Sequence, residues 1–273
     1  MEYLLLAIIA LCAGILGSLV GLGGGVVLIP ATLYFGVQLG YFPDITPQRV
    51  VGLSVVMMIF TGLSSTISYM RSKQVDFISG SIFFIGSAPG AILGAWLNKG
   101  LNIDSFNLYF GILLIVLSTL LFVRDKLKPI QWFMDHGIKR SFTDRQGQTF
   151  EFGYPVWFAV GFSFFVGMIS GLFGIGGGSL IVPAMILLFR FPAHVAVATS
   201  MFMVFLTSIV NSISHIALGN VPWHYTVPVI IGAYLGAKLG AALNKRMKSK
   251  TVVLVLQIVM VLIGIRSIIE GLV

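Results

Sequence analysis

Long apolar stretches without any charge set the first limit on how this chain can fold. Several stretches of about 20 residues lack Asp, Glu, Lys and Arg, which is the length that a helix needs to cross a bilayer. Hydrophobic residues make up 57% of the 273 positions and charged residues only 10%. A soluble fold would leave much of that apolar surface in water. The sequence therefore predicts an all-α polytopic protein of the cell (inner) membrane.

The net charge of +8 is explained by membrane topology rather than by nucleic-acid binding. The 17 Lys and Arg residues lie almost entirely between the apolar stretches, as expected of loops kept on the cytoplasmic side. We therefore expect the lipid bilayer as a partner and no nucleic acid. The single Cys12 lies in an apolar stretch and allows neither a disulfide framework nor a cysteine metal site.

Two blocks of sequence recur and divide the chain into homologous halves. The first block recurs at an offset of 153, as in Gly21 and Gly174, and the second at 146, as in Ser54 and Ser200. The first block pairs Gly14, Gly21, Gly23, Gly24, Gly25 and Pro30 with Gly167, Gly174, Gly176, Gly177, Gly178 and Pro183; the second pairs Ser54, Thr61, Ser68, Gly86, Gly90, Gly94 and Asn98 with Ser200, Thr207, Ser214, Gly232, Gly236, Gly240 and Asn244. We expect an N-terminal repeat (1–124), a cytoplasmic linker (125–154) and a C-terminal repeat (155–273).

Each half begins with a glycine-interrupted apolar segment, at 3–39 and at 155–190. As one helix, about 36 residues would extend roughly 54 Å, against about 30 Å of hydrocarbon. The sequence therefore predicts two short arms joined by a turn at membrane depth. Three uninterrupted spans follow in each half, at 49–70, 77–98 and 104–123, and at 195–216, 223–244 and 251–270.

The positions of Lys and Arg favour an inverted repeat with both termini outside. If all eight segments crossed once, these residues would divide nine to seven, without bias (Lys238, inside a span and expected to extend toward the cytoplasmic face, is left out). If each interrupted segment returns to its own side, only Arg49, Lys99 and Arg266 lie outside. The thirteen on the cytoplasmic side are then Arg71, Lys73, Arg124, Lys126, Lys128, Lys139, Arg140, Arg145, Arg190, Lys245, Arg246, Lys248 and Lys250.

The linker between the halves alternates in polarity on both sides of residues 144–147. This pattern predicts a small β-hairpin with strands at 138–143 and 148–152. We interpret the linker as solvated and without a binding site.

The two glycine-rich turns are the strongest candidate binding site. Residues 21–25 and 174–178 each precede an apolar arm, and a broken helix presents backbone N–H groups and its positive dipole end at the start of the second arm. An anion could bind there without a charged side chain, and we assign substrate binding to Gly23, Gly24, Gly25, Gly176, Gly177 and Gly178. The alternative is that these glycines only allow close helix packing, an interpretation that also suits the glycines spaced by four.

A stripe of polar residues on the next span extends this candidate site. Ser200, Thr207, Ser208, Asn211 and His215 recur at helical spacing, with Ser54, Thr61, Ser65 and Ser68 as the counterpart in the first half. We assign Ser54, Ser200, Thr207, Asn211 and His215 to a substrate pathway. The alternative is that the hydroxyls bond to carbonyls of their own helix or join helices.

No Asp or Glu lies deep within a predicted span. A carboxylate proton relay or a cation site is therefore not expected. His215 is the group that could titrate in the pathway; the alternative is that it is only a wetted residue near the end of its span. The scattered histidines lack metal-binding spacing. No nucleophile and base can be paired, so we predict neither a catalytic residue, nor a cofactor, nor a metal, and no enzyme activity.

The quoted residues resemble the TauE/SafE family of sulfite and organosulfonate exporters. The resemblance rests on residues 21–30 with their repeat at 174–183, and on the matched helix ends at 90–98 and 236–244. It covers nearly the whole chain and implies a secondary transporter that exports small sulfur-containing anions such as sulfite or sulfoacetate. It leaves open which anion is carried and in which direction, whether protons are the coupling ion, the oligomeric state, and the role of the loop at 125–154.

Two alternatives remain open from sequence. One is an anion channel of the same substrate class, which dependence on a proton gradient would distinguish. The other is an integral-membrane enzyme or a docking subunit, which would need intramembrane acids, a histidine cluster or a large partner-facing domain.

Overall fold

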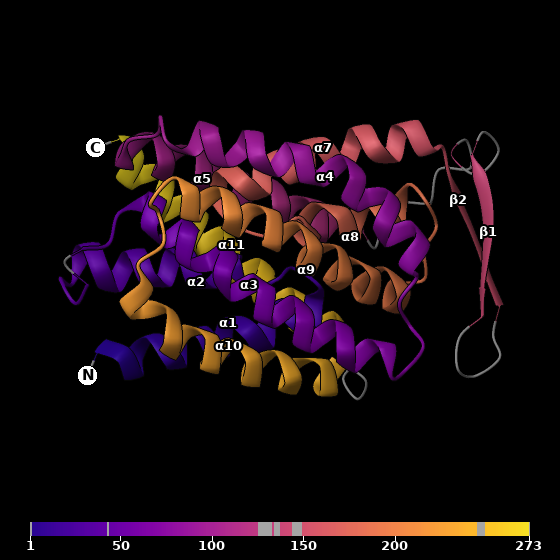
Figure 1. The fold of residues 1–273 in the computed structure, drawn as a ribbon, viewed down its shortest axis with the longest axis horizontal. Helices are drawn as coiled ribbons and strands as arrows, with labels where there is room; N and C mark the ends of the chain where they lie inside the picture. The colour runs from indigo at the N-terminus through magenta and orange to yellow at the C-terminus, as the bar shows by residue number, and fades with distance from the viewer. Residues whose placement is uncertain are drawn as a thin grey trace.

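The computed structural model describes residues 2–42, 44–124, 133, 137–143, 149–244 and 249–272. The helices lie side by side, and a two-stranded sheet sits beyond one end of the bundle (Figure 1). The first half contains α1 (Glu2–Val20), α2 (Gly25–Leu33), a π-helix η1 (Tyr34–Gln38), α3 (Pro47–Met70), α4 (Phe77–Asn98) and α5 (Ile103–Arg124). Strands β1 (Ile138–Thr143) and β2 (Thr149–Tyr154) precede α7 (Val156–Phe173), α8 (Gly178–Leu187), α9 (Ala193–Ala217), α10 (Trp223–Asn244) and α11 (Ser249–Leu272).

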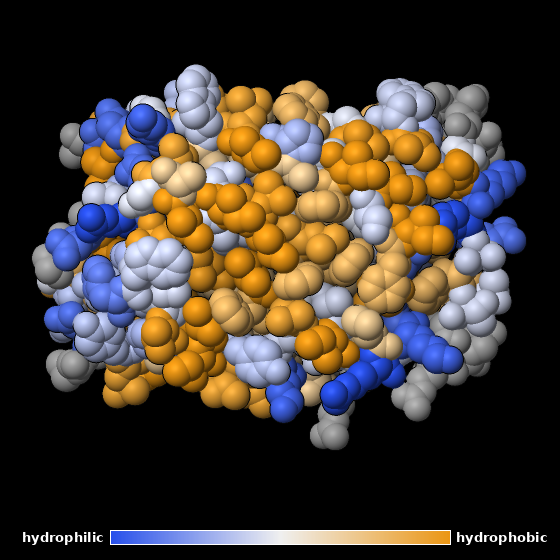
Figure 2. Space-filling model, in the orientation of Figure 1, coloured by the Kyte–Doolittle hydropathy of each residue, from blue (hydrophilic) through white to orange (hydrophobic). Residues whose placement is uncertain are grey.

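Seven of the described helices are long and apolar enough to cross a membrane: α1, α3, α4, α5, α7, α9 and α10. Apolar side chains cover the middle of the surface, and hydrophilic ones gather toward the two ends (Figure 2). This arrangement confirms the prediction of a helical, multi-pass membrane protein.

The first arms of the interrupted segments are longer than the sequence analysis expects. Helices α1 and α7 have 19 and 18 residues and can cross a membrane themselves, whereas α2 and α8 have only 9 and 10. The expectation of two short arms is therefore wrong for the first arm. The physical reason is that the helix-breaking glycines come only after about five turns of regular helix.

The two halves pack mainly on each other. Glycines along a helix of each half let it approach a helix of the other half closely. Helix α4 packs along α7, and α10 packs along α1. A Cβ at Gly90 would lie 2.0 Å from the carbonyl oxygen of Phe164, and a Cβ at Gly236 would lie 2.2 Å from that of Leu11. The two contacts are equivalent in the repeat, because Phe164 and Leu11 differ by the same offset of 153. For the glycines spaced by four, helix packing is thus the role that the structure supports.

Contacts between loops define two ends of the bundle. We call the end that carries Arg71, Lys73 and Arg140 the basic end. There, Arg140 in β1 pairs with Asp76 before α4 at 3.2 Å, and the Gly153 amide in β2 donates to the carbonyl oxygen of Phe189 after α8. At the opposite end, Gln48 donates to the carbonyl oxygen of Leu101 at 2.5 Å. The loop of residues 39–46 and the α9–α10 connection also lie at the opposite end (Figure 1).

The linker forms the expected β-hairpin, but it is not simply solvated. Strands β1 and β2 pair antiparallel, from Ile138 opposite Tyr154 to Thr143 opposite Thr149. Phe152 and Tyr154 are fully buried against the bundle. The interpretation of a solvated linker is therefore wrong for the inner face of β2, because its aromatic side chains pack on the helices. The turn expected at 144–147 lies outside the described residues.

Candidate functional site

Each interrupted segment changes direction at glycines with left-handed backbone. The φ angles are +83°, +84° and +95° at Gly21, Gly23 and Gly24, and +66° and +76° at Gly174 and Gly176. Residues with a Cβ rarely adopt this conformation. We refer to residues 21–24 and 174–177 as the first and second glycine turns.

The two glycine turns touch each other at the centre of the bundle. A Cβ on Gly25 would lie 2.0 Å from the carbonyl oxygen of Gly174, and a Cβ on Gly178 would lie 1.9 Å from that of Gly21. Added Cβ atoms at Gly23 and Gly176 would each lie within 3 Å of the sulfur of Met58, which is midway along α3. The glycine turns of both halves thus touch each other beside the middle of helix α3.

Helices α2 and α8 begin at this contact without side-chain caps. Among the described backbone hydrogen bonds of the turns, Val27 and Leu28 donate to Gly24, while Ser179 and Ile181 donate to Gly176 and Gly177. The amides before them, at residues 23–26 and 175–178, make no described bond to the backbone. Uncapped N–H groups and the helix dipole favour an anion, so the arrangement can attract negative charge without a cationic side chain.

Ser54 and Ser200 each hold the glycine turn of the other half. The Ser54 hydroxyl donates to the carbonyl oxygen of Gly174. The Ser200 hydroxyl lies 3.1 Å from the carbonyl oxygen of Gly21 and 2.8 Å from that of Val197 in its own helix, so its one hydrogen is shared between the turn and the helix. Both serines are fully buried.

The remaining predicted residues lie along α9 and contact helices α4 and α7. The Thr207 hydroxyl is 2.7 Å from that of Ser87, and the Asn211 amide donates to the Ser170 hydroxyl at 3.2 Å. The structure therefore places these residues beside the glycine turns, in the separate interface of α9 with α4 and α7. Within it, the Oδ1 atom of Asn211 is a buried acceptor without a described donor.

His215 is fully buried, not at a wetted helix end. Its Nε2 lies 3.0 Å from the carbonyl oxygen of Gly171, and its Nδ1 lies 3.1 Å from the Asn220 amide nitrogen. Since a carbonyl only accepts, Nε2 carries the proton and Nδ1 accepts from Asn220. The neutral ring thus satisfies both nitrogens.

Tyr69, the counterpart of His215 at the offset of 146, is not among the residues predicted from sequence. The Tyr69 hydroxyl donates to the carbonyl oxygen of Ser18 at 2.9 Å. Ser18 is itself the counterpart of Gly171, so both side chains hold the end of the first arm of their own half. The repeat offset alone would have pointed from position 215 to position 69, although the residue type differs between the two positions.

The glycine turns are closed off from solvent in this conformation. All residues from 21 to 26 and from 174 to 179 are buried. The larger described cavity, about 540 Å³, lies instead between α2, η1, α5 and α11, where Asp104 and Arg266 form part of its lining. A smaller one of about 240 Å³ lies at the basic end beside Lys73 and Phe142. Within the described ranges, no group of three His, Cys, Asp or Glu side chains could hold a metal ion.

The fold defines a polytopic membrane protein in which two glycine turns meet inside the helix bundle. The sulfite exporter TauE/SafE family matches residues 6–267, and the chain belongs to this family.

Curated relatives agree with this assignment. The chain is 47% identical over 271 residues to the probable membrane transporter protein YunE of Bacillus subtilis, covering 99% of each chain. It is 27% identical to the probable membrane transporter protein YjnA of the same organism, over 96% of this chain and 98% of the relative. It is 26% identical to the probable membrane transporter protein MJ0441 of Methanocaldococcus jannaschii, over 96% and 93%. No solved structure gives a significant match.

Proposed function

We propose that this membrane transporter exports small sulfur-containing anions such as sulfite or organosulfonates. The observation that carries the proposal is the contact of two uncapped helix N termini at the centre of the bundle. Backbone amides and helix dipoles attract an anion without binding it as tightly as a buried Arg or Lys would, which suits passage. The family's description as sulfite exporters supports the substrate class.

We further propose that Gly23, Gly24, Gly25, Gly176, Gly177 and Gly178 contact the anion when the turns separate. Ser54 and Ser200 then release the carbonyl oxygens that they hold, and the freed hydroxyls, with Thr207, Asn211 and His215, line the path. The unused Oδ1 of Asn211 is consistent with a polar path, since buried polar atoms normally have partners. The described acidic residues lie at helix ends, in loops or, for Glu151, in strand β2 of the linker, where they repel an anion least.

The proposed topology is an inverted repeat with both termini outside and the basic end in the cytoplasm. The thirteen-to-three distribution of Lys and Arg favours it. Further support comes from the reciprocal contacts of the halves, in which Ser54 with Gly174 mirrors Ser200 with Gly21. Such reciprocity is expected of repeats related by an axis in the membrane plane.

Substrate and mechanism are tested in proteoliposomes containing the purified protein. We expect uptake of radiolabelled sulfite, with competition by sulfoacetate and no effect of K⁺ or Mg²⁺ concentration at constant ionic strength. Accumulation above the outside concentration when a proton gradient is imposed would support secondary transport with protons as the coupling ion. Equilibration without accumulation would indicate a channel. No uptake of sulfite, thiosulfate, sulfoacetate or taurine above that of protein-free vesicles would contradict the proposal.

Topology is tested by labelling single cysteines in a Cys12→Ala background with a membrane-impermeant maleimide. Lys99 lies at the opposite end and Arg71 at the basic end, and both are exposed. We expect Lys99→Cys to react in intact cells, and Arg71→Cys only after permeabilisation. The reverse pattern, or equal labelling of both, would rule out the proposed orientation.

A further inference from the structure

The β-hairpin of the linker is attached to the bundle at two places at the basic end, the start of α4 and the chain just after α8. Arg140 pairs with Asp76 at the start of α4, and Tyr154 donates to Ser79 in the first turn of α4 at 2.6 Å. The Gly153 amide bonds to the carbonyl oxygen of Phe189, two residues after α8. The hairpin thus joins the start of α4 to the end of the arm that begins at the second glycine turn.

Asp76 is the centre of this attachment. Its carboxylate accepts from Arg140 and from the Ile78 amide through Oδ1, and from the Ser79 hydroxyl at 2.5 Å through Oδ2. Its own amide donates to the Thr199 hydroxyl in α9 at 3.0 Å. The Asp76 side chain is only 4% exposed, and charge-assisted bonds of this kind are stronger than neutral ones. Asp76 therefore ties α4 to β1 through its carboxylate, and both to α9 through its backbone amide.

Aromatic side chains of β2 pack against α4 and the chain after α8, close to Asp76. The rings of Phe152 and Phe191 have centroids 3.8 Å apart, and the Tyr154 ring lies 5.3 Å from both Phe83 and Phe189. Burial raises the pKa of Tyr154 to about 12, so its hydroxyl stays protonated and remains a donor at working pH. Polar and apolar contacts thus close the basic end over α8.

The repeat provides no equivalent closure at the opposite end. At the offset of 146, Asp76 corresponds to Pro222 and Ser79 to Tyr225. Tyr225 packs there against Phe42 from the loop of residues 39–46, with ring centroids 5.5 Å apart. The charged attachment therefore belongs to the linker, and not to the structure that both halves share.

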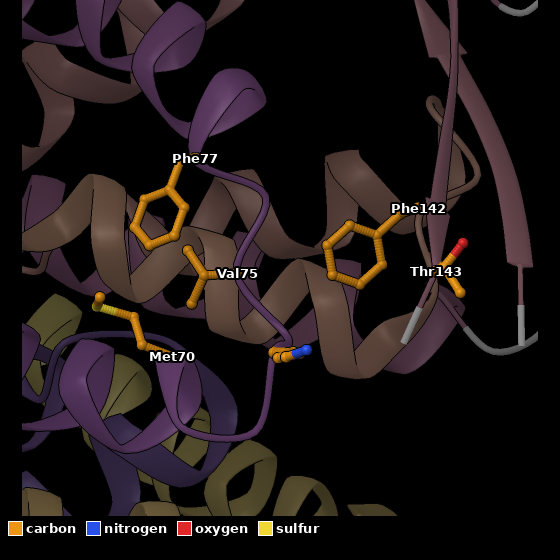
Figure 3. A pocket seen from close by; sticks show the side chains of 6 residues that line it. Met70, Val75, Phe77, Phe142 and Thr143 are labelled. Carbon is orange, nitrogen blue, oxygen red and sulfur yellow. The ribbon is translucent and has the colours of Figure 1, made fainter. Parts of the chain in front are cut away.

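On its other edge, the hairpin is separated from the bundle by a cavity. Phe142 of β1 points toward Val75 and Phe77 across a space of about 240 Å³ (Figure 3), and Thr143 also lines this space. The hairpin is therefore tightly held beside Asp76 and loosely packed above the α3–α4 connection. This leaves room for it to tilt once the ion pair opens.

We propose that the linker hairpin is the gate at the basic end, and that Arg140 and Tyr154 hold it closed through Asp76 and Ser79. The gate opens when the hairpin tilts away from Phe189 and Phe191, which exposes the interior between β2 and the second glycine turn. This gating role rests on the proposed transport function, since a gate has a purpose only where a substrate passes.

Ser163 of α7 provides a probe beneath the gate. It is fully buried, and its hydroxyl has no described partner. Ala159 and Val166, on the same face of α7, belong to the buried cluster that contains Phe152 and Tyr154. A Cβ at Gly177 would lie 3.1 Å from Val166, so Ser163 is placed between hairpin and turn. Ser163→Cys changes one atom and disturbs little.

The experiment measures the rate at which Ser163→Cys, in a Cys12→Ala background, reacts with an impermeant thiol reagent applied from the basic end. We expect slow labelling in this parent, and labelling about tenfold faster or more when Arg140→Gln or Tyr154→Phe is added, because each removes a buried hydrogen bond. Lys139→Gln is the matched control: it removes the same charge from the neighbouring residue, which is exposed, and should leave the rate unchanged.

Labelling does not depend on which anion is carried, so the two proposals can fail separately. Faster labelling without uptake of any sulfur anion would support the gating role of the hairpin and contradict the proposed substrate class. Equal rates in the parent, Arg140→Gln and Tyr154→Phe would overturn the gate, whatever the transport result. Faster labelling with Lys139→Gln as well would also overturn it, because the effect would then be one of surface charge.

Discussion

Tyr69 and His215 occupy the same position in the two halves and do different chemistry. Each bonds to a carbonyl oxygen at the end of its own first arm, Tyr69 to Ser18 at 2.9 Å and His215 to Gly171 at 3.0 Å. Tyr69 lies near the basic end of α3, and His215 near the opposite end of α9. A phenol ordinarily titrates near pH 10, whereas an imidazole does so near neutrality. The shared geometry serves both halves, and the titratable group distinguishes one end.

A similar contrast exists between the glycine turns, which recur in both halves, and the linker hairpin, which is present at one end. Ser54, Ser200 and the turns are equivalent in contact as well as in position. Asp76 is replaced by Pro222 at the offset of 146, so the charged attachment of the linker hairpin is not repeated. We therefore expect the symmetric elements to hold the central contact and the asymmetric elements to distinguish the two ends.

We expect the largest effect from substitutions at the two glycine turns, which test whether the turns are equivalent. Gly25→Ala and Gly178→Ala should each lower transport about 100-fold or more, because the new Cβ would lie about 2 Å from a backbone oxygen of the opposite turn. Transport in proteoliposomes and the amount of folded protein are both measured. Gly161→Ala in α7 is the control, since a Cβ there meets nothing within 4 Å. Normal transport by either turn variant would show that the close contact is dispensable.

The serines should give a smaller and equal effect. Ser54→Ala and Ser200→Ala each leave a buried carbonyl oxygen without its partner, which destabilises by about 1–3 kcal/mol. Thermal unfolding in detergent measures this, and transport should fall by roughly tenfold in both. Ser214→Ala is the control, because its hydroxyl bonds only to the Val210 carbonyl oxygen in its own helix at 3.0 Å. A large effect of one serine alone would mean that the turns are not equivalent.

The smallest effect concerns the pH response. Protonation of His215 turns Nδ1 into a donor, which conflicts with the donating Asn220 amide. The contact therefore contributes when the ring is neutral, and is lost as the pH falls far enough to charge it. His215→Gln should flatten the acid side of a transport profile by roughly two- to threefold, while Tyr69→Phe should lower transport without changing its shape. Superimposable wild-type and His215→Gln profiles between about pH 5.5 and 8 would remove His215 from the pH response.

The repeats explain how much of this structure was predictable. Offsets of 153 and 146 identify equivalent turns and helices. Alternation identifies the hairpin strands at 138–143 and 148–152, of which the second is observed at Thr149–Tyr154. The partners of Ser54 and Ser200 were not predictable, because a hydroxyl gives no indication of which distant carbonyl it will meet. The face-to-face contact of the turns, and the burial of Phe152 and Tyr154, likewise depend on how the halves interlock.

That interlocking has a consequence for how the protein is made. The most extensive helix contacts, α4 with α7, α1 with α10, α5 with α11 and α3 with α9, all join one half to the other. A ribosome completes α1 long before α10 exists, so the narrow face of α1 that receives Gly236 has only lipid beside it during synthesis. Assembly must therefore wait for the last third of the chain. Two half-length chains made separately should each insert but remain unable to complete their packing until they meet.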